Sequence, residues 1–353
     1  MPNLACLFWV KCATFAPQNK ISMKKIFYIG LLAVALYAVS CSNDFEVTAP
    51  WQDIPVVYGL LSIEDPVHYM RVEKAFLDPK ANALEQAKIP DSIYYDNVTV
   101  QLQRASNGQV FTLTRVDGNL VGLPREEGVF ATTPNWLYKI DSSEIKLKAG
   151  ETINLKIDRG DGLPEVTAQT VILDRGRLRT PDPFSSGRFN FDNNLDTKLS
   201  WSGDANARIF DAKLFFKYAE IANGQVEEKK LEWLWGRGVR NENNAPEISV
   251  SKKGREFYEF VKNNIEVNPN ITRVFLGIDV EVVAGGAALE RYVNVSLANT
   301  GITGSQIIPT YTNLSEGRGI FSSVSRLTSQ NVLLTPRTLD SLKNGFLTKN
   351  LNF

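Results

Sequence analysis

The sequence predicts a mostly-β protein, with an N-terminal immunoglobulin-like antiparallel sandwich followed by a second β-rich domain that carries one or two short helices. Three observations favour this fold class. Short runs alternate between apolar and polar residues, Asn-Gly and Asp-Gly pairs separate several of these runs, and one long segment has the periodicity of an amphipathic helix. A mature chain of roughly 310 residues exceeds what one hydrophobic core usually organises, so two domains are expected.

Strand signals dominate the first predicted domain, residues 54–175. In the alternating run 97–105, Val98, Val100 and Leu102 share one face. The pair Asn107-Gly108 follows and predicts a hairpin with a type I′ turn, in which both central residues need a positive φ. The remaining elements are expected as strands at 54–62, 67–76, 109–116, 152–160 and 163–173, a turn at Asp161-Gly162, and a short helix at 79–90.

A segment rich in Arg, Pro, Gly, Ser and Asn, residues 174–194, follows these strands. We place the domain boundary within it, near 175–185, and the second domain at 185–353. Strands of the second domain are expected at 197–203, 207–221, 227–235, 273–285 and 290–299, with a turn at Asn223-Gly224.

The clearest helical pattern covers residues 251–265. Ser251 is placed to cap this helix, because its hydroxyl can accept from a backbone N–H of the first turn. The residues that fall together on its apolar face are Phe257, Tyr258, Val261 and Ile265. Pro336 is expected to open a second, shorter helix over 337–344.

The start of the chain has the pattern of an export signal. Lys24 and Lys25 precede an apolar run, residues 26–39, that is shorter than the roughly 20 residues of a bilayer span. Small residues then lead to Cys41, which resembles the lipobox cysteine of bacterial lipoproteins, where it becomes the mature N-terminus and carries acyl chains such as palmitate. An ordinary signal peptide with a chance cysteine is the alternative.

We therefore expect a signal peptide over residues 1–40, lipidation at Cys41, and a lipid-anchored tether over 41–53. Met23 is the expected translation start, because residues 1–22 would give the signal an unusual extension; a longer, atypical signal is the alternative. Multiple acyl chains hold a protein on a membrane almost permanently.

Charge and cysteine content exclude several partners. The full chain has 39 basic and 39 acidic residues, and loss of residues 1–40 removes four lysines and no acids, which leaves a net charge of −4. This balance gives no basic footprint for nucleic acid. Cys41 would be the only cysteine of the mature chain, so neither a disulfide nor a cysteine-ligated metal is expected.

No catalytic constellation is visible in the sequence. His68 is the only histidine, which leaves little from which to build a catalytic triad or a multi-histidine zinc site, and we expect a strand residue with a local partner. The aspartates that cluster near turns are Asp158, Asp161, Asp182, Asp192 and Asp196. Turns favour aspartate for its local backbone hydrogen bonds. We expect no cofactor, no metal and no enzymatic activity; a hydrolase that uses only carboxylates is the alternative.

The most suggestive binding feature is the run 231–238, "LEWLWGRG". In a strand, Leu231, Trp233 and Trp235 point to one face, with Arg237 and Arg240 close by. The two indoles are either part of the core or an exposed platform on which sugar rings stack. The second alternative makes Trp233, Trp235 and Arg237 candidate ligand-binding residues, with a glycan as the ligand.

Several stretches together resemble the uncharacterised outer-membrane lipoproteins of Bacteroidota that are often encoded beside TonB-dependent transporters. They include "VVYGLLS" after the tether, "GETINLKI", "FYEFVKNN" and, late in the chain, "YTNLSEGRGIF". In the last, the matching residues are Asn313, Gly317, Gly319, Ile320 and Phe321, whereas Glu316 and Arg318 are more charged than the pattern suggests. We interpret this motif as structural: the glycines permit a turn or a close backbone approach, and Phe321 anchors the next strand.

The resemblance implies a location and a partner rather than a reaction. We expect an outer-membrane lipoprotein that faces the cell exterior and acts as a non-enzymatic accessory or ligand-binding subunit of a TonB-dependent nutrient transporter. The acidic residues Asp44 and Glu46 after Cys41 agree with surface export. A glycan-binding surface protein and a structural envelope protein are the alternatives.

Overall fold

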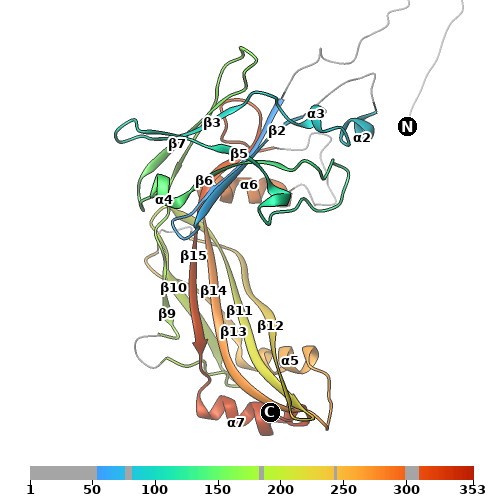
Figure 1. The fold of residues 1–353 in the computed structure, drawn as a ribbon. Coiled ribbons are helices and arrows are strands. Elements are labelled where there is room, and N and C mark those ends of the chain that lie inside the picture. Colours follow the sequence, from blue (N-terminus) through green and yellow to red (C-terminus); the bar gives the residue numbers. More distant parts are fainter. Residues whose placement is uncertain (1–53, 76–81, 183–186, 242–244, 299–309) are drawn as a thin grey trace, which may run out of the picture. The chain divides into compact units, whose positions relative to one another are not determined.

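Three β-sheets build the part of the protein that the computed structural model describes, residues 54–75, 82–182, 187–241, 245–298 and 310–353 (Figure 1). The predicted signal peptide, Cys41 and the tether lie outside these residues. Residues Trp51–Phe353 form a compact unit of their own. The prediction of a mostly-β fold with a sandwich is confirmed.

The largest sheet has eight strands in the order β12-β11-β14-β15-β1-β2-β6-β5. Their bounds are β1 Ile54–Leu61, β2 Val67–Ala75, β5 Thr114–Asp117, β6 Trp136–Asp141, β11 Ala207–Ala222, β12 Gln225–Arg240, β14 Thr272–Gly286 and β15 Arg318–Val332. All its neighbouring pairs are antiparallel except β1 and β15, which run parallel. Strands from both predicted domains therefore share one sheet.

Two smaller antiparallel sheets and several helices complete the described fold. One sheet has the order β4-β3-β7-β8, with β3 Thr99–Arg104, β4 Val110–Thr112, β7 Thr152–Asp158 and β8 Val166–Val171. The other has the order β13-β10-β9, with β9 Arg177–Thr180, β10 Asp196–Ser202 and β13 Ile248–Lys253. The helices are α2 Ala83–Gln86, α3 Pro90–Ile93, η1 Gly118–Leu120, α4 Ser142–Ile145, α5 Gly254–Asn264, α6 Ala287–Ala298, α7 Pro336–Asn344 and η2 Lys349–Leu351.

Each smaller sheet shares a hydrophobic core with part of the large one. In the first core, Val57 and Met70 of the large sheet meet Leu102 and Leu155 of the β3–β7 sheet. In the second core, aromatic side chains dominate, and the large sheet meets β10, α5 and α7 through residues that include Phe191, Trp201, Phe216, Trp235 and Phe257. Figure 1 shows β11, β12, β14 and β15 side by side, with α5 and α7 near one end of them. Both cores are sheet-on-sheet packings in which alternate residues of each strand point inward.

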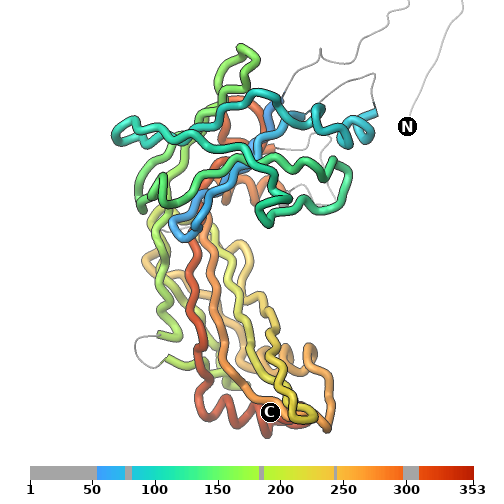
Figure 2. Tube along the Cα trace, viewed as in Figure 1, coloured from blue at the N-terminus to red at the C-terminus, as the bar shows by residue number. Residues whose placement is uncertain are grey.

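The last strand, β15, belongs to both cores. Its first half pairs with β1, from Val56 opposite Arg318 to Leu61 opposite Ser323, and its second half pairs with β14. In Figure 2 the blue start of the described chain lies beside the orange-red first half of β15. Phe321 is fully buried in the first core, and Val332 lies in the second. The first sandwich is therefore completed by residues from the far end of the chain.

The predicted turns are confirmed in one hairpin and corrected in another. Asn223 and Gly224, between β11 and β12, have φ values of 51° and 78°, as a type I′ turn requires. The hairpin at Asn107-Gly108 is present, but only Gly108 has a positive φ. The Gly108 N–H donates to the Arg104 carbonyl at 2.9 Å, so the strands are joined by a longer loop and the predicted type I′ turn is wrong there.

Three predictions about helices need correction. Residues 290–299, expected as a strand, belong to α6 up to Ala298. Ser251 lies in β13, and α5 begins at Gly254 with Lys253 at its N-cap, although the predicted apolar face from Phe257 to Ile265 is buried. The second predicted domain thus contains three α-helices within the described residues instead of one or two. The helix expected at 79–90 is described only from residue 82, as the one-turn helices α2 and α3.

Candidate functional site

A cavity beside α6 combines apolar walls with charged side chains and is a candidate functional site. We call it the α6 cavity; its volume is about 420 Å³, within the range of small-molecule pockets. The lining residues come from β11, β12, β14 and α6 and are Ile209, Phe210, Asp211, Arg237, Gly238, Arg240, Val283, Gly285, Leu289, Val293 and Asn294. The helix packs against β11, β14 and β15, so the cavity lies between the helix and the β11–β12 side of the sheet.

The junction between β14 and α6 determines how closely the helix approaches the sheet. A Cβ at Gly285 would meet the Leu289 side chain at 2.7 Å and the Ile209 side chain at 3.0 Å. A larger residue would require these two side chains to shift, and both of them line the cavity. Gly285 therefore leaves room for Leu289 and Ile209 beside the strand.

Polar groups are few in the cavity and are concentrated on β12. The Arg240 guanidinium donates to Asn294 Oδ1 at 2.6 Å, which links β12 to α6. The Gly238 N–H donates to Asp211 Oδ1 at 2.7 Å. Arg237 has neither a hydrogen bond nor an ion pair within the part of the chain that the structure describes, and its side chain is exposed. A mainly apolar wall with a few placed polar groups is the usual arrangement of a ligand pocket.

A second hollow of about 440 Å³ lies on the other side of α6, over β1 and β2. There the hydroxyl groups of Tyr58 and Tyr292 are 3.3 Å apart, and their rings meet edge to face at 6.2 Å. Burial, followed by the hydrogen bond with Tyr292, raises the pKa of Tyr58 to about 12, so this phenol stays protonated at neutral pH. The pair ties α6 to β1, and Leu289 lines both hollows.

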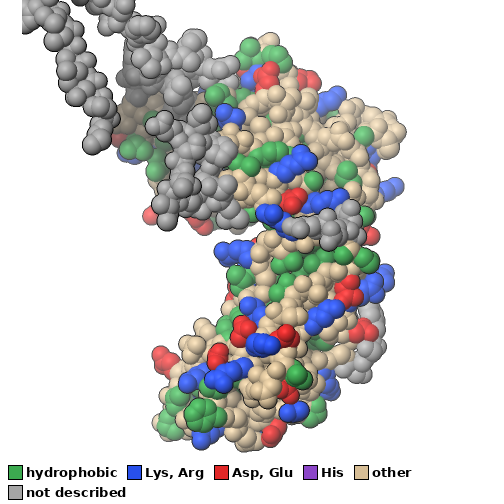
Figure 3. Space-filling model, turned by 180° about the vertical axis from the view of Figure 1, so that it is seen from behind, with side chains coloured by type: hydrophobic (Ala, Val, Ile, Leu, Met, Phe, Trp, Pro, Cys, Tyr) green, Lys and Arg blue, Asp and Glu red, His purple; other side chains and the backbone are tan. Residues whose placement is uncertain are grey.

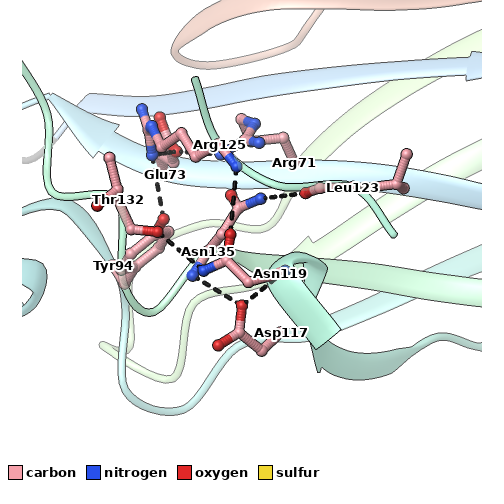
Figure 4. Close-up of polar contacts among 9 residues, drawn as sticks. All are labelled: Arg71, Glu73, Tyr94, Asp117, Asn119, Leu123, Arg125, Thr132 and Asn135. Carbon is pink, nitrogen blue, oxygen red and sulfur yellow. Dashed lines mark hydrogen bonds and ion pairs between the residues drawn. The ribbon is translucent and has the colours of Figure 1, made fainter. Parts of the chain in front are cut away.

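A partly buried polar cluster fixes the loop between β5 and β6, residues 118–135 (Figure 4). Asp117 Oδ1 accepts the backbone N–H groups of Asn119 and Asn135, both at 3.0 Å. Arg125 pairs with Glu73 of β2 at 2.7 Å and donates to the Tyr94 hydroxyl at 3.1 Å. These contacts hold an otherwise irregular loop in one arrangement.

The same loop exposes apolar side chains. Leu120 is 85% exposed, and Val129 and Phe130 are each nearly half exposed. Exposed apolar side chains are the kind of group that a partner protein covers where they form a contiguous patch.

The structure places the predicted tryptophans in the core. Trp235 is 1% exposed, and its indole N–H donates to the Val250 carbonyl of β13 at 3.0 Å. Trp233 is partly buried and stacks on Phe260 of α5, with ring centroids 5.0 Å apart and planes 10° apart. An exposed platform made of both rings is therefore wrong, because the face that carries Trp233 and Trp235 packs against α5 and β13. Arg237 is separate from them and lines the α6 cavity.

The motif 313–321 has the structural role that the sequence indicates. The Asn313 side chain donates to the Phe321 carbonyl at 2.7 Å and accepts from the Phe321 N–H at 3.0 Å, so it occupies both backbone groups of that residue. Gly317 and Gly319 have positive φ values of 96° and 104°. A Cβ at either position would overlap a backbone carbonyl oxygen of β1, that of Pro55 or that of Val57. The glycines are thus required for close approach of β15 to β1.

Three of the aspartates near turns, Asp158, Asp161 and Asp192, make the local hydrogen bonds expected of them, whereas Asp196 pairs with Lys253 at 2.6 Å. Asp158 Oδ1 accepts the Gly160 N–H at 2.9 Å, and Asp161 Oδ1 accepts the Leu163 N–H at 3.0 Å. Within the described ranges, no three His, Cys, Asp or Glu side chains are grouped so that they could hold a metal ion. Among the same residues, no helix is both long and apolar enough to cross a bilayer.

His68 differs from its expected environment. It is 2% exposed in β2, and neither ring nitrogen has a hydrogen-bond partner among the residues that the structure describes. Figure 3 agrees with this burial, since no histidine colour is visible on the face that it shows. Burial lowers the pKa of His68, and the nearby Asp65 carboxylate opposes this shift only in part.

We expect the free energy of unfolding to fall as pH decreases through about 6.5, where the unfolded chain begins to bind a proton at His68 that the folded chain does not. The loss should level off below the lowered pKa of the folded state. Urea titrations between pH 7.5 and 5.5 measure it directly, because the sequence has one histidine. His68→Leu should flatten the dependence; an unchanged slope in this variant would show that other groups cause it.

Sequence reasoning identified Arg237 and Arg240, as neighbours of the two tryptophans, but missed the rest of the α6 cavity. Val293 and Asn294 were expected on a strand, Leu289 lay between two expected strands, and Asp211 had no distinguishing pattern. The signal that could have located the helix is the run Ala287 to Glu290, "AALE", which contains only strong helix formers.

Comparison with known proteins identifies no relative by sequence: no known protein family matches the chain, and no curated protein matches it. Among solved structures, the chain is similar to the FN1–FN3 domains of chicken CNTN1, with a TM-score of 0.24 and 11% identity over 68% of this chain. It is also similar to the C-terminal globular domain of an oligosaccharyltransferase from Pyrococcus abyssi, with a TM-score of 0.24 and 11% identity over 65% of this chain. The matched regions span 63% and 45% of those two chains. We draw nothing about this chain from likenesses at such scores.

Proposed function

We propose that the protein is a non-enzymatic, lipid-anchored ligand-binding subunit that faces the exterior of the outer membrane and works with a TonB-dependent nutrient transporter. The observation that carries the ligand-binding part is the α6 cavity, which combines apolar walls with the guanidinium of Arg237, a group that pairs with no other residue that the structure describes. Concave, mainly apolar sites with few polar groups are typical of small-molecule binding.

The anchor and the transporter partner rest on the sequence. The lysines before the apolar run, Cys41, and the resemblance of "YTNLSEGRGIF" to the Bacteroidota lipoproteins support them. The fixed loop 118–135 adds a structural reason to expect a protein partner, since Leu120 and Phe130 lie exposed on a loop that the Glu73–Arg125 pair holds in place.

The partner is tested by isolating the tagged full-length protein from native membranes in mild detergent. We expect a transporter barrel in near-equal amount when the retained proteins are identified by mass spectrometry. Deletion of the gene should also impair growth on at least one nutrient of a broad panel. Recovery of the protein alone, together with normal growth on every nutrient, would contradict the proposal.

The ligand-binding part is tested by expressing the Val293→Trp variant in the strain that lacks the gene. The larger side chain fills the α6 cavity from the helix. We expect this variant to be anchored and to retain its partner but not to restore growth. Arg291→Gln is the matched control, because Arg291 lies exposed on the same helix and does not line the cavity. Full restoration of growth by Val293→Trp would exclude the cavity as the binding site.

A further inference from the structure

We infer that the α6 cavity binds an amphipathic ligand with an apolar body and a single anionic group, such as a carboxylate or a sulfonate. This inference rests on the proposed ligand-binding function and specifies the chemical class of its ligand. It follows from three features of the cavity: its walls, its two arginines and its one carboxylate.

The walls select an apolar body. Ile209, Val283, Leu289 and Val293 line the space. These side chains come from two strands and one helix, so they surround a bound group on more than one side. Apolar surface that leaves water on binding there contributes favourably in proportion to its area.

The arginines select an anionic group. Arg237 and Arg240 both come from β12, and within the described ranges neither forms an ion pair. Among the residues that the structure describes, Arg240 makes a single side-chain hydrogen bond, to Asn294, which leaves most of its N–H groups available. A planar guanidinium matches a carboxylate or sulfonate through two parallel N–H donors, and such charge-assisted bonds are stronger than neutral ones.

Asp211 is the one acidic residue of the lining, and it limits the ligand to a small negative charge. One of its oxygens already accepts the Gly238 N–H at 2.7 Å. Two guanidinium groups against one carboxylate leave the lining with a net positive charge. A cationic ligand would face both arginines, and a ligand with several negative charges would also be repelled by Asp211.

Two fluorescent probes with the same apolar body provide the test. 8-Anilinonaphthalene-1-sulfonate carries one negative charge, and N-phenyl-1-naphthylamine carries none. With the purified Trp51–Phe353 unit, which forms a compact body of its own, we expect the sulfonate to bind about tenfold more tightly than the uncharged probe. Fluorescence titration measures both dissociation constants without detergent.

Variants assign this difference to the arginine. Arg237→Gln should weaken sulfonate binding about tenfold and leave the uncharged probe within about twofold of wild type, because only the charged bond is lost. Arg291→Gln removes the same charge from an exposed position on α6 and should change neither constant. Val293→Trp on the helix and Val283→Phe on the strand should each abolish binding of both probes.

The outcomes separate this inference from the proposed function. If the two probes bind equally tightly, or if Arg237→Gln leaves the dissociation constant of the sulfonate unchanged, the inference of an anionic ligand is wrong. The cavity would then remain a binding site for apolar groups. Failure of both probes to bind, or binding that survives Val293→Trp and Val283→Phe, would overturn the cavity as a ligand site. Equal weakening by Arg237→Gln and Arg291→Gln would show a general effect of charge and would also overturn the assigned contact.

Discussion

Gly319→Ala is expected to lower the free energy of unfolding by about 4 kcal/mol or more, which places it among the most damaging single substitutions. Gly319 sits opposite Val57 in the parallel β1–β15 pair, and an added Cβ would overlap the Val57 carbonyl oxygen. Neither strand can move away easily, because β1 also pairs with β2 and β15 continues into its pairing with β14. The φ of 104° adds strain of its own for any residue with a side chain.

Two alanine substitutions separate these causes. Gly122 has a φ of 80° and open space where a Cβ would lie, so Gly122→Ala should show the conformational cost alone, about 1–2 kcal/mol. Gly286 has an ordinary φ, and the nearest neighbour of an added Cβ, Ser322 Oγ, would lie at 3.4 Å. Gly286→Ala should therefore leave the free energy of unfolding nearly unchanged. Urea unfolding followed by tryptophan fluorescence compares the three. A cost for Gly319→Ala no greater than that for Gly122→Ala would show that β15 does not approach β1 as closely as the structure indicates.

The same strand pair shows what the sequence could and could not predict. Hairpins are local structures. The Asn223-Gly224 pair, together with the alternation of apolar and polar residues on both sides of it, therefore predicted the turn and the long strands beside it. The parallel pairing of β1 with β15 joins segments that lie more than 250 residues apart, Val56–Leu61 and Arg318–Ser323, and no local pattern encodes a partner at such a distance. The motif around Gly317 and Gly319 predicted a close backbone approach, but the sequence did not indicate which strand would be approached.

The candidate site was less predictable than the fold. In the segment before residue 298, Val293 and Val295 alternate with Asn294 and Ser296, which is a strand pattern. The residues nonetheless form α6, because strong helix formers precede them and the open face of the sheet accepts a helix there. With a strand expected in place of that helix, a cavity between it and β12 could not be anticipated. Arg237 was singled out through its neighbours Trp233 and Trp235, which face the opposite way into the core.

Trp235→Ala is expected to cost about 3–5 kcal/mol of unfolding free energy, because it removes a large side chain from the second core. The indole lies 5.0 Å from the Trp233 ring and 6.3 Å from the Phe191 ring, measured between centroids. Its N–H donates to the Val250 carbonyl, which joins β12 to β13. The substitution would thus create a cavity and leave a backbone acceptor without its partner.

Leu234→Ala is the matched control for this variant, since the adjacent side chain points to the other face of β12 and is 36% exposed. Its cost should stay below about 1 kcal/mol. The pair of variants also decides how any binding experiment on this strand is interpreted. If Trp235→Ala is strongly destabilised, a loss of carbohydrate binding in that variant reports damage to the core and gives no support to a stacking platform. If instead Trp235→Ala unfolds at the same urea concentration as wild type, the indole is not part of the core, and the hypothesis of an exposed pair with Trp233 regains its basis.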